Sequence, residues 1–346
     1  MPFTIIRNDI TKLRVDAIVN AANTTLLMGG GVCGAIFRAA GAERLQTACD
    51  RLAPIKTGQA VITPGFDIPA KYIIHTAGPF YEGGQHGEET LLRACYLNSL
   101  ELAARHNCES IAFPSISTGI YGYPKTEAFR IATAAIRAFL SEHDIAVSLV
   151  VFEKESFAVN GKLRRAVESY IGEHYIDEDR IRRRKSFDVG REVSAYTDAT
   201  KLSALPLITA TNKLLEVGLA VPESASLEDL VGNLDEPFSA TLLRLIDATG
   251  KKDSEIYNRA NIDRRLFSKI RSNAHYAPSK PTVLAFAVAL ELNLEQTEDL
   301  LERAGFALSH SRKFDVIVEY FIRTRLYDIY EINEVLFSYD QPLLGG

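Results

Sequence analysis

Short apolar runs alternate with longer amphipathic stretches through the N-terminal half of the chain. The apolar runs predict strands at residues 3–7, 17–21, 59–63, 72–77, 110–114 and 147–152. Between them, apolar residues recur at helical spacing over residues 34–40, 88–105 and 125–142. Strands that alternate with helices are typical of a mostly parallel or mixed sheet with helices on both faces. We therefore expect an α/β fold, a three-layer αβα sandwich, closed by a helix over residues 162–172.

From residue 238 onward the pattern changes to closely spaced short helices. They are expected at residues 240–248, 253–260, 263–271, 281–292 and 294–304, with an amphipathic stretch at 314–337. Such a series predicts an all-α bundle. We expect an α/β domain over residues 1–172, a partly helical linker over 173–237 and a helical domain over 238–346. The linker contains an acidic-then-basic run with too little apolar content for a core.

Composition and charge agree with a globular protein of two domains. The chain has 346 residues, more than one hydrophobic core usually holds, and 47% of them are hydrophobic. A net charge of -5 argues against a basic surface over the whole protein, so any contact with nucleic acid needs a local patch. The polar start and the lack of a long apolar run predict no signal peptide, no membrane contact and a cytoplasmic location.

The cysteines do not indicate a metal or redox site. The four are Cys33, Cys49, Cys95 and Cys108, without a Cys-x-x-Cys spacing or a nearby histidine pair. We expect reduced thiols, no metal and no bound cofactor.

Two glycine-containing loops each follow an apolar strand and precede a helix. The first covers residues 19–36 and includes Gly-Gly-Gly-Val at 29–32; the second covers residues 114–124. Glycine lets the backbone approach an anion closely, and a helix N-terminus adds unpaired N–H donors. A glycine triplet alone is weak evidence, but two such loops facing each other would clamp a diphosphate. Neither loop matches the dinucleotide fingerprint or the Gly-Lys-Ser/Thr phosphate loop.

Five segments in the same order resemble the macrodomain family, most closely its MacroD-type branch of mono-ADP-ribosyl hydrolases. They are NDIT at residues 8–11, VDAIVNAAN at 15–23, GGGV at 29–32, HTAGP at 75–79 and STGIYGYP at 117–124. The likeness covers about half of the chain. It implies that the first domain binds ADP-ribose, and that any catalysis occurs in the same pocket.

The resemblance also implies a role for each motif residue. Asp9 would accept a hydrogen bond from the adenine amino group, and Phe152 would stack on the adenine ring. Other ligand contacts would come from Ile10, Gly30, Gly31, Val32, Ser117, Thr118, Gly119, Ile120 and Tyr121. Asn23 would hold the distal ribose and the leaving group, whereas Asn20 would brace the loop. His75 lies in an apolar strand and is expected to be a hydrogen-bonded core residue; core packing is an equal alternative for Phe152.

The chain departs from the MacroD-type pattern at two positions. Where that pattern has Asp after Gly-Gly-Gly-Val and His four residues later, this chain has Cys33 and Phe37. The Asp is credited with activating water, so an obvious general base is missing. Three interpretations remain, in order of preference. In the first, the pocket hydrolyses its substrate through a water positioned by Asn23, the backbone and a phosphate. In the second it binds ADP-ribose without cleavage, and in the third the Cys33 thiol acts as base or nucleophile. A buried Cys33 that only fills space is simpler than a catalytic one.

The C-terminal helices resemble the lambda-repressor/Cro-like helix-turn-helix domain. Residues 253–260 would be the positioning helix and 263–271 the recognition helix. The candidate contacts to DNA are Arg264, Arg265, Ser268, Lys269 and Arg271. The alternative is a protein-interaction bundle with a solvated basic face.

The sequence as a whole therefore predicts a protein that binds ADP-ribose and hydrolyses it from mono-ADP-ribosylated proteins or from O-acetyl-ADP-ribose. The alternative is a non-catalytic reader of ADP-ribose that regulates a DNA-binding or protein-binding helical domain.

Overall fold

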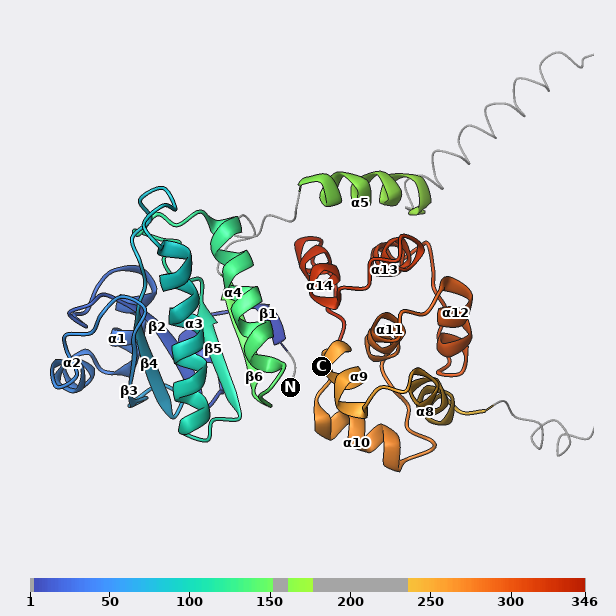
Figure 1. The fold of residues 1–346 in the computed structure, drawn as a ribbon, viewed down its shortest axis with the longest axis horizontal. Helices are drawn as coiled ribbons and strands as arrows, with labels where there is room; N and C mark the ends of the chain where they lie inside the picture. The colour runs from blue at the N-terminus through green and yellow to red at the C-terminus, as the bar shows by residue number, and fades with distance from the viewer. Residues whose placement is uncertain (1–2, 152–160, 177–235, 346) are drawn as a thin grey trace, which may run out of the picture.

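The computed structural model describes residues 3–151, 161–176 and 236–345. Figure 1 shows an α/β part followed by a part made of helices. We call residues 3–151 the α/β domain, and residues 161–176 with 236–345 the helical domain. The predicted αβα sandwich with a mixed sheet and the all-α C-terminal part are confirmed. Most of the expected linker lies outside the described residues.

The sheet has the strand order β1-β6-β5-β2-β4-β3. Its strands are β1 (Phe3–Arg7), β2 (Ala17–Ala22), β3 (Ala60–Pro64), β4 (Tyr72–Ala77), β5 (Ser110–Pro114) and β6 (Ala146–Val151). All six were predicted, with ends displaced by one residue at most. Neighbouring strands pair in parallel except β3, which runs antiparallel to β4. The carboxyl ends of the parallel strands therefore meet at one side of the sheet, where α/β folds bind their ligands.

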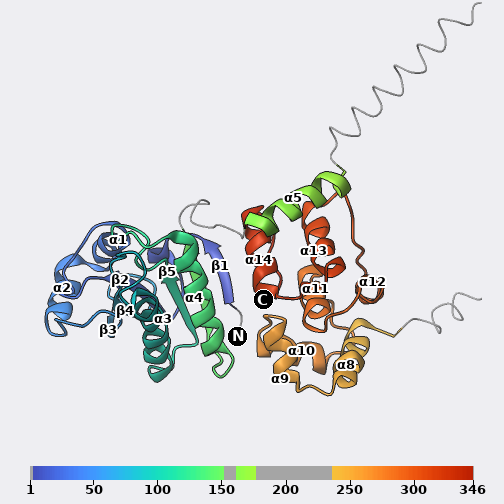
Figure 2. The same cartoon turned by 45° about the horizontal axis from the view of Figure 1, so that its top comes forward.

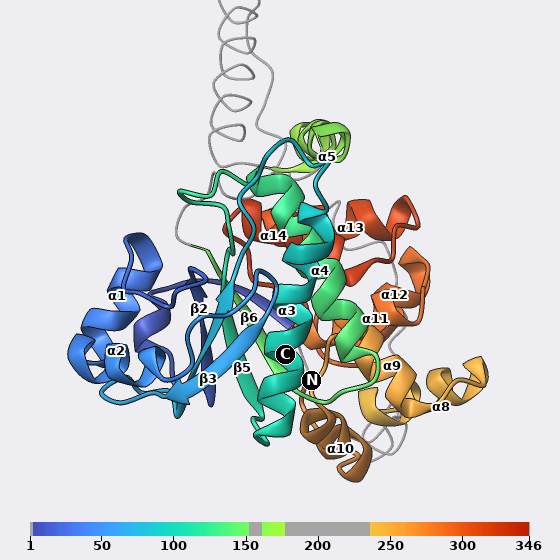
Figure 3. The same ribbon diagram turned by 60° about the vertical axis from the view of Figure 1, so that its left-hand side comes forward.

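Helices cover both faces of the sheet (Figure 3). One layer is α1 (Gly31–Ala40) with α2 (Ala42–Asp50); the other is α3 (Glu88–Arg105) with α4 (Lys125–Leu140). Successive strand residues face opposite layers, so Ile18 joins the core of α1 and α2 whereas Val19 joins the core of α3 and α4. The sequence did not predict α2, because it buries only two residues, Leu45 and Cys49, and shows little apolar periodicity.

The helical domain contains α8 (Phe238–Thr249), α9 (Asp253–Arg259), α10 (Arg264–Ser272), α11 (Lys280–Ala289), α12 (Leu294–Glu302), α13 (Lys313–Arg323) and α14 (Ile329–Ser338). α11 is buried on all sides from Thr282 to its end, as a central helix must be. The expected amphipathic stretch at 314–337 is two helices. The chain turns at Arg325, whose φ is 57°, and Asp328 then caps α14 by accepting from the N–H groups of Tyr330 and Glu331.

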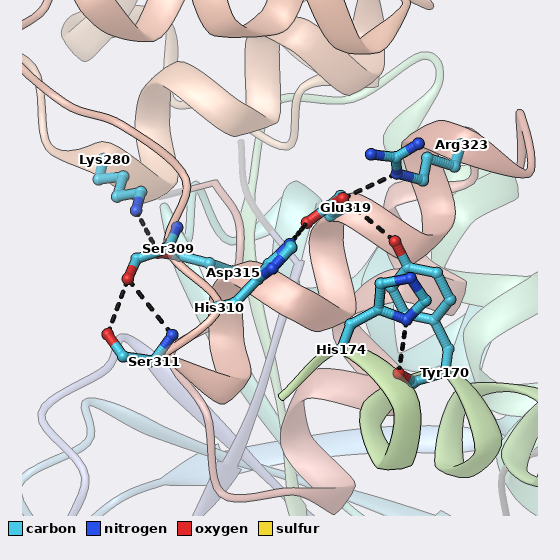
Figure 4. Close-up of polar contacts among 9 residues, drawn as sticks. All are labelled: Tyr170, His174, Lys280, Ser309, His310, Ser311, Asp315, Glu319 and Arg323. Carbon is cyan, nitrogen blue, oxygen red and sulfur yellow. Dashed lines mark hydrogen bonds and ion pairs between the residues drawn. The ribbon is translucent and has the colours of Figure 1, made fainter. Parts of the chain in front are cut away.

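The helix expected to close the α/β domain, α5 (Gly161–His174), packs instead against α13 (Figure 2). The buried carboxylate of Glu319 on α13 explains this position (Figure 4). It accepts a hydrogen bond from Tyr170 on α5 at 3.1 Å, and contacts His310 Nε2 and Arg323 Nε, both at 2.7 Å. Periodicity predicted the helix but not its partner, because that contact joins residues far apart in sequence.

The two domains share one contiguous buried apolar cluster, which runs from the α3 and α4 layer into the helical domain. Arg137 of α4 pairs with Asp328 at 2.9 Å, and its guanidinium lies 4.4 Å from the centre of the Tyr330 ring.

Within the described ranges, no helix is long and apolar enough to span a membrane.

Candidate functional site

A cleft opens at the carboxyl ends of the parallel strands. It consists of two adjoining cavities, of about 270 Å³ and about 440 Å³. Both are lined by Gly31, Val32, Ser115 and Gly119, so they form one elongated site. The smaller cavity lies between the loops that follow β2 and β5, and the larger one adjoins the end of β1. We call them the loop cavity and the β1 cavity.

The first glycine loop forms the N-terminus of α1. The helix starts at Gly31, three residues earlier than predicted, and Gly31 has a φ of +56°, a conformation that glycine adopts without strain. The N-cap, Gly30, provides no side chain. The N–H groups of the first helical residues, which include Val32 and Cys33, have no acceptor within the helix. These donors border the loop cavity and offer a site for an anion.

The second loop provides a matching row of donors. Among the described residues, the backbone N–H groups from Ser117 to Tyr121 have no hydrogen-bond acceptor. Ser117 is buried with a φ of 64°, and its hydroxyl has no partner. A Cβ at Gly78, at the end of β4, would overlap the Ser117 hydroxyl and lie 2.8 Å from Ile116 Cγ2. Gly78 therefore lets the loop pack closely against β4, where its residues line the loop cavity.

The two loops approach each other across the loop cavity. A Cβ built on Gly30 would lie 3.8 Å from Cδ1 of Ile120, whose side chain is 86% exposed at the rim. Tyr121 forms one wall; its ring stacks on Phe80 at 3.7 Å, and its carbonyl accepts from the Tyr81 N–H. No Lys or Arg lines either described cavity, so backbone dipoles are the groups available to an anion.

The β1 cavity holds the predicted adenine residues. The Asp9 carboxylate accepts from the Thr11 hydroxyl at 2.7 Å and the Thr11 N–H at 3.0 Å. These bonds, mainly that of the Thr11 hydroxyl, and nearby Lys12 hold the pKa of Asp9 below its usual value, so an ionised acceptor faces the cavity. Ile10 and Val150 add an apolar lining. Phe152 lies outside the described residues.

Asn23 lines the loop cavity, but its amide is engaged in its own loop. Its Nδ2 donates to the Leu27 carbonyl at 2.8 Å, and its Oδ1 accepts from the Leu27 N–H at 3.1 Å and the Thr25 hydroxyl at 2.8 Å. The second hydrogen of Nδ2 can donate to a ligand while these three bonds stay in place.

Cys33 connects the loop cavity to a buried polar chain. The Asn20 amide donates to Cys33 Sγ at 3.6 Å and lies 3.0 Å from His75 Nδ1. The other ring nitrogen of His75 is 2.9 Å from the Thr63 hydroxyl. Burial lowers the pKa of His75 to about 4, so the ring is neutral near pH 7. Asn20 thus braces the loop from inside, and His75 is a core residue.

No carboxylate lines the loop cavity in the described structure; its titratable groups are Cys33 and Tyr121. Burial raises the pKa of the Tyr121 phenol, and proximity to Cys33 adds to this effect. Phe37 is buried beside the His75 ring and lines neither cavity. The described residues contain no cluster of metal-binding side chains. Among the described residues, the loop cavity therefore offers no carboxylate as a general base.

The structure brings all the predicted ligand residues that it describes to this cleft. Three cleft residues were not assigned from the sequence. Gly78 lies in one of the quoted motifs, and Ser115 and Val150 line the cavities from strand ends.

The predicted DNA contacts are separate from the cleft. All five are exposed on α10; Arg265 pairs with Glu109 of the α/β domain at 3.0 Å, and Arg271 pairs with Asp253.

Comparison with known proteins gives one family. The Macro domain model matches residues 19–132. Macro domain-containing protein CT2219 of Chlorobaculum tepidum is 58% identical over 137 residues, 40% of this chain and 79% of that protein. The O-acetyl-ADP-ribose deacetylase of Escherichia coli is 47% identical over 158 residues, 44% of this chain and 89% of that protein. The mouse ADP-ribose glycohydrolase MACROD1 is 48% identical over 157 residues, 44% of this chain and 48% of that protein.

Proposed function

Because the chain belongs to the macro domain family, we propose that its cleft binds ADP-ribose and hydrolyses ADP-ribose from mono-ADP-ribosylated proteins or from O-acetyl-ADP-ribose. The observation that carries this proposal is the pair of facing loops with unpaired N–H donors, continuous with an acidic acceptor in the β1 cavity. The names of the bacterial deacetylase and the mouse glycohydrolase support the same ligand.

The shape of the cleft suggests the orientation of the ligand. Adenine occupies the β1 cavity, with its amino group donating to Asp9. The diphosphate lies between the N-terminus of α1 and the second loop, where opposed backbone donors replace the missing cations. The distal ribose occupies the loop cavity beside Asn23, Cys33 and Tyr121. Stacking of Phe152 on adenine stays a prediction.

Hydrolysis in this cleft relies on positioning. On a mono-ADP-ribosylated protein, water adds to the anomeric carbon of the distal ribose, the bond to the substrate carboxylate breaks, and the water proton passes to a diphosphate oxygen. On O-acetyl-ADP-ribose, water adds instead to the acetyl carbonyl carbon and the ester bond breaks, with one water proton passing to the ribose oxygen and the other to a diphosphate oxygen. Asn23 would orient the water or the departing group with the second hydrogen of its Nδ2, while its bonds to Leu27 hold the loop. Hydrogen bonds of this kind supply catalysis without a protein base.

A non-catalytic reader is the second candidate. It is favoured by the lack of a carboxylate among the described residues that line the loop cavity, where Cys33 stands in place of the family's Asp. In that case ADP-ribose is the signal and the helical domain the output. The third candidate uses the Cys33 thiol, which lines the same cavity and accepts from Asn20.

One experiment separates these candidates. The full chain, Asn23→Ala and Cys33→Ala are incubated with a mono-ADP-ribosylated protein, and free ADP-ribose is measured alongside binding by calorimetry. Hydrolysis lost in Asn23→Ala but kept in Cys33→Ala supports the proposal. Loss in Cys33→Ala alone favours the thiol, and binding without any release identifies a reader. No heat with ADP-ribose at millimolar concentration refutes all three.

DNA binding by the helical domain stays a prediction. The observation in its favour is a hollow of about 510 Å³ between α9 and α10, whose lining includes Lys251, Lys252 and Arg264. The Arg265 pair with Glu109 and the Arg271 pair with Asp253 work against it. A band shift on duplex DNA that weakens steeply with salt supports the prediction, whereas no shift at low salt contradicts it.

A further inference from the structure

The edge strand β1 is held by the helical domain. An edge strand leaves a row of backbone groups without partners on its open side. Here the side chain of Asn261 takes the place of a neighbouring strand: its Oδ1 accepts from the Phe3 N–H at 2.7 Å, and its Nδ2 donates to the Phe3 carbonyl at 2.9 Å. Asn261 is buried, with a φ of 54°, and Gly345 packs so closely on it that a Cβ there would lie 2.5 Å from the Asn261 carbonyl oxygen.

The other end of β1 is also in contact with this domain. Arg7, the last residue of the strand, pairs with Asp340 at 3.3 Å and lies 5.7 Å from the centre of the Phe337 ring. At the start of the strand, the Phe3 ring lies 5.9 Å from that of Tyr330. Both ends of this five-residue strand are therefore in contact with the helical domain. The contacts come from α14, from residues next to it and from the turn between α9 and α10.

The strand leads directly into the β1 cavity. Arg7 is followed by Asn8, Asp9 and Ile10, and all three line that cavity. The opposite wall is formed by Val32 and other residues of α1 and the second loop. A shift of β1 along or across the sheet thus moves Asp9 relative to the rest of the site. A ligand that bridges both walls depends on their relative position.

We propose that the helical domain is a working part of the adenine end of the cleft: by holding β1 through Asn261 and Asp340, it positions Asp9, so that ADP-ribose binding and these contacts to β1 strengthen each other. This inference rests on the proposed function, because it takes the β1 cavity as the adenine subsite. Asn261 and Asp340 are positioning residues that do not touch the ligand. By linkage, the factor by which these contacts raise the ligand affinity equals the factor by which the ligand stabilises them.

The chain offers a matched control for this idea. Arg265 and Glu109 form a second ion pair between the same two domains, and both side chains are exposed. Glu109 precedes the first residue of β5, at the side of the sheet opposite the cleft. Arg265→Gln therefore removes an exposed ion pair between the same two domains without acting on β1.

The test measures the affinity of the full chain for ADP-ribose, for AMP and for ribose 5-phosphate, which lacks adenine. We expect Asn261→Ala to weaken ADP-ribose and AMP binding about fivefold or more. Asp340→Asn should weaken them by about one and a half to fivefold, as for an exposed ion pair. Ribose 5-phosphate binding should not change in either variant. Arg265→Gln should leave all three affinities unchanged.

Equal losses in Asp340→Asn and Arg265→Gln, or equal losses for all three ligands, would overturn the inference. Hydrogen exchange on the wild-type chain tests it without any substitution. ADP-ribose should slow exchange in residues 338–341, next to Asp340, but not in α8 or α12. Unchanged exchange at 338–341 with bound ligand overturns the inference and leaves the proposed function intact, whereas a wild-type chain that binds no ADP-ribose removes both.

Discussion

Glu334 on α14 is expected to make the stability of the helical domain depend on pH. Its half-buried carboxyl lies near Glu331, Asp328 and Arg137. Burial, followed by the negative charges of Glu331 and Asp328, raises the pKa of Glu334 to about 7, although Arg137 opposes the rise. The perturbation we propose is Glu334→Gln, which keeps the shape of the protonated acid and removes the charge.

The sign and size of the effect follow from the change in pKa on folding. A carboxyl whose pKa rises from 4.5 in the unfolded chain to about 7 in the folded protein binds its proton more tightly when folded. The stabilisation of the folded protein by this group is fully present below about pH 4.5 and is lost as the pH rises through about 7. The difference corresponds to about 3 kcal/mol, an upper value because part of the group is in contact with solvent.

The assay is urea unfolding of the wild-type chain and Glu334→Gln between pH 5 and pH 8.5. The chain has no tryptophan, so far-ultraviolet circular dichroism is the probe. The two proteins should be similarly stable at pH 5, and the variant should become more stable by up to about 3 kcal/mol at pH 8.5. Burial lowers the pKa of His75, which acts in the opposite direction, but this contribution cancels between wild type and variant.

Glu298→Gln, at an exposed position of α12, is the matched control and should run parallel to the wild type at every pH. The raised pKa of Glu334 is refuted if Glu334→Gln also runs parallel to the wild type. It is equally refuted if the variant gains stability mainly as the pH falls.

Three further substitutions test the cleft and the α5 contact. Ser117→Ala removes a buried hydroxyl that has no partner in the described structure, so the free energy of unfolding should stay the same or rise by about 1 kcal/mol. Calorimetry should show weaker ADP-ribose binding by this variant, and unchanged binding would contradict a ligand role for Ser117. Gly78→Ala should displace the second loop and lower the ADP-ribose affinity at least tenfold, which corresponds to about 1.4 kcal/mol. Its control is Gly172→Ala, where the new Cβ meets nothing within 4 Å, and this variant should leave the ADP-ribose affinity unchanged. Glu319→Gln should destabilise the helical domain by about 3 kcal/mol and expose α5 to limited proteolysis; a protease-resistant α5 would mean that apolar packing alone holds it.

Periodicity and glycine placement were enough for much of this protein. The six strands, the two loops and most helix positions were predictable, because side-chain alternation and glycine conformation are local properties. The position of Cys33 at the start of α1 and the missing carboxylate were also readable before any coordinates. The departures have local causes: α2 buries too few residues to show a pattern, and the break at Arg325 carries no glycine or proline.

The sequence by itself determined the αβα fold, the glycine loops and the residues gathered around the cleft, since these follow from short-range pattern and chain order. Only the tertiary structure decided that α5 packs on Glu319, that the Ser117 hydroxyl lacks a partner and that Asn261 takes the place of a strand beside Phe3. Asn261 and Phe3 are 258 residues apart, and no periodicity encodes such a contact. Side-chain pairing at that range depends on how complete domains pack, which is why the link between the helical domain and the cleft appeared only in three dimensions.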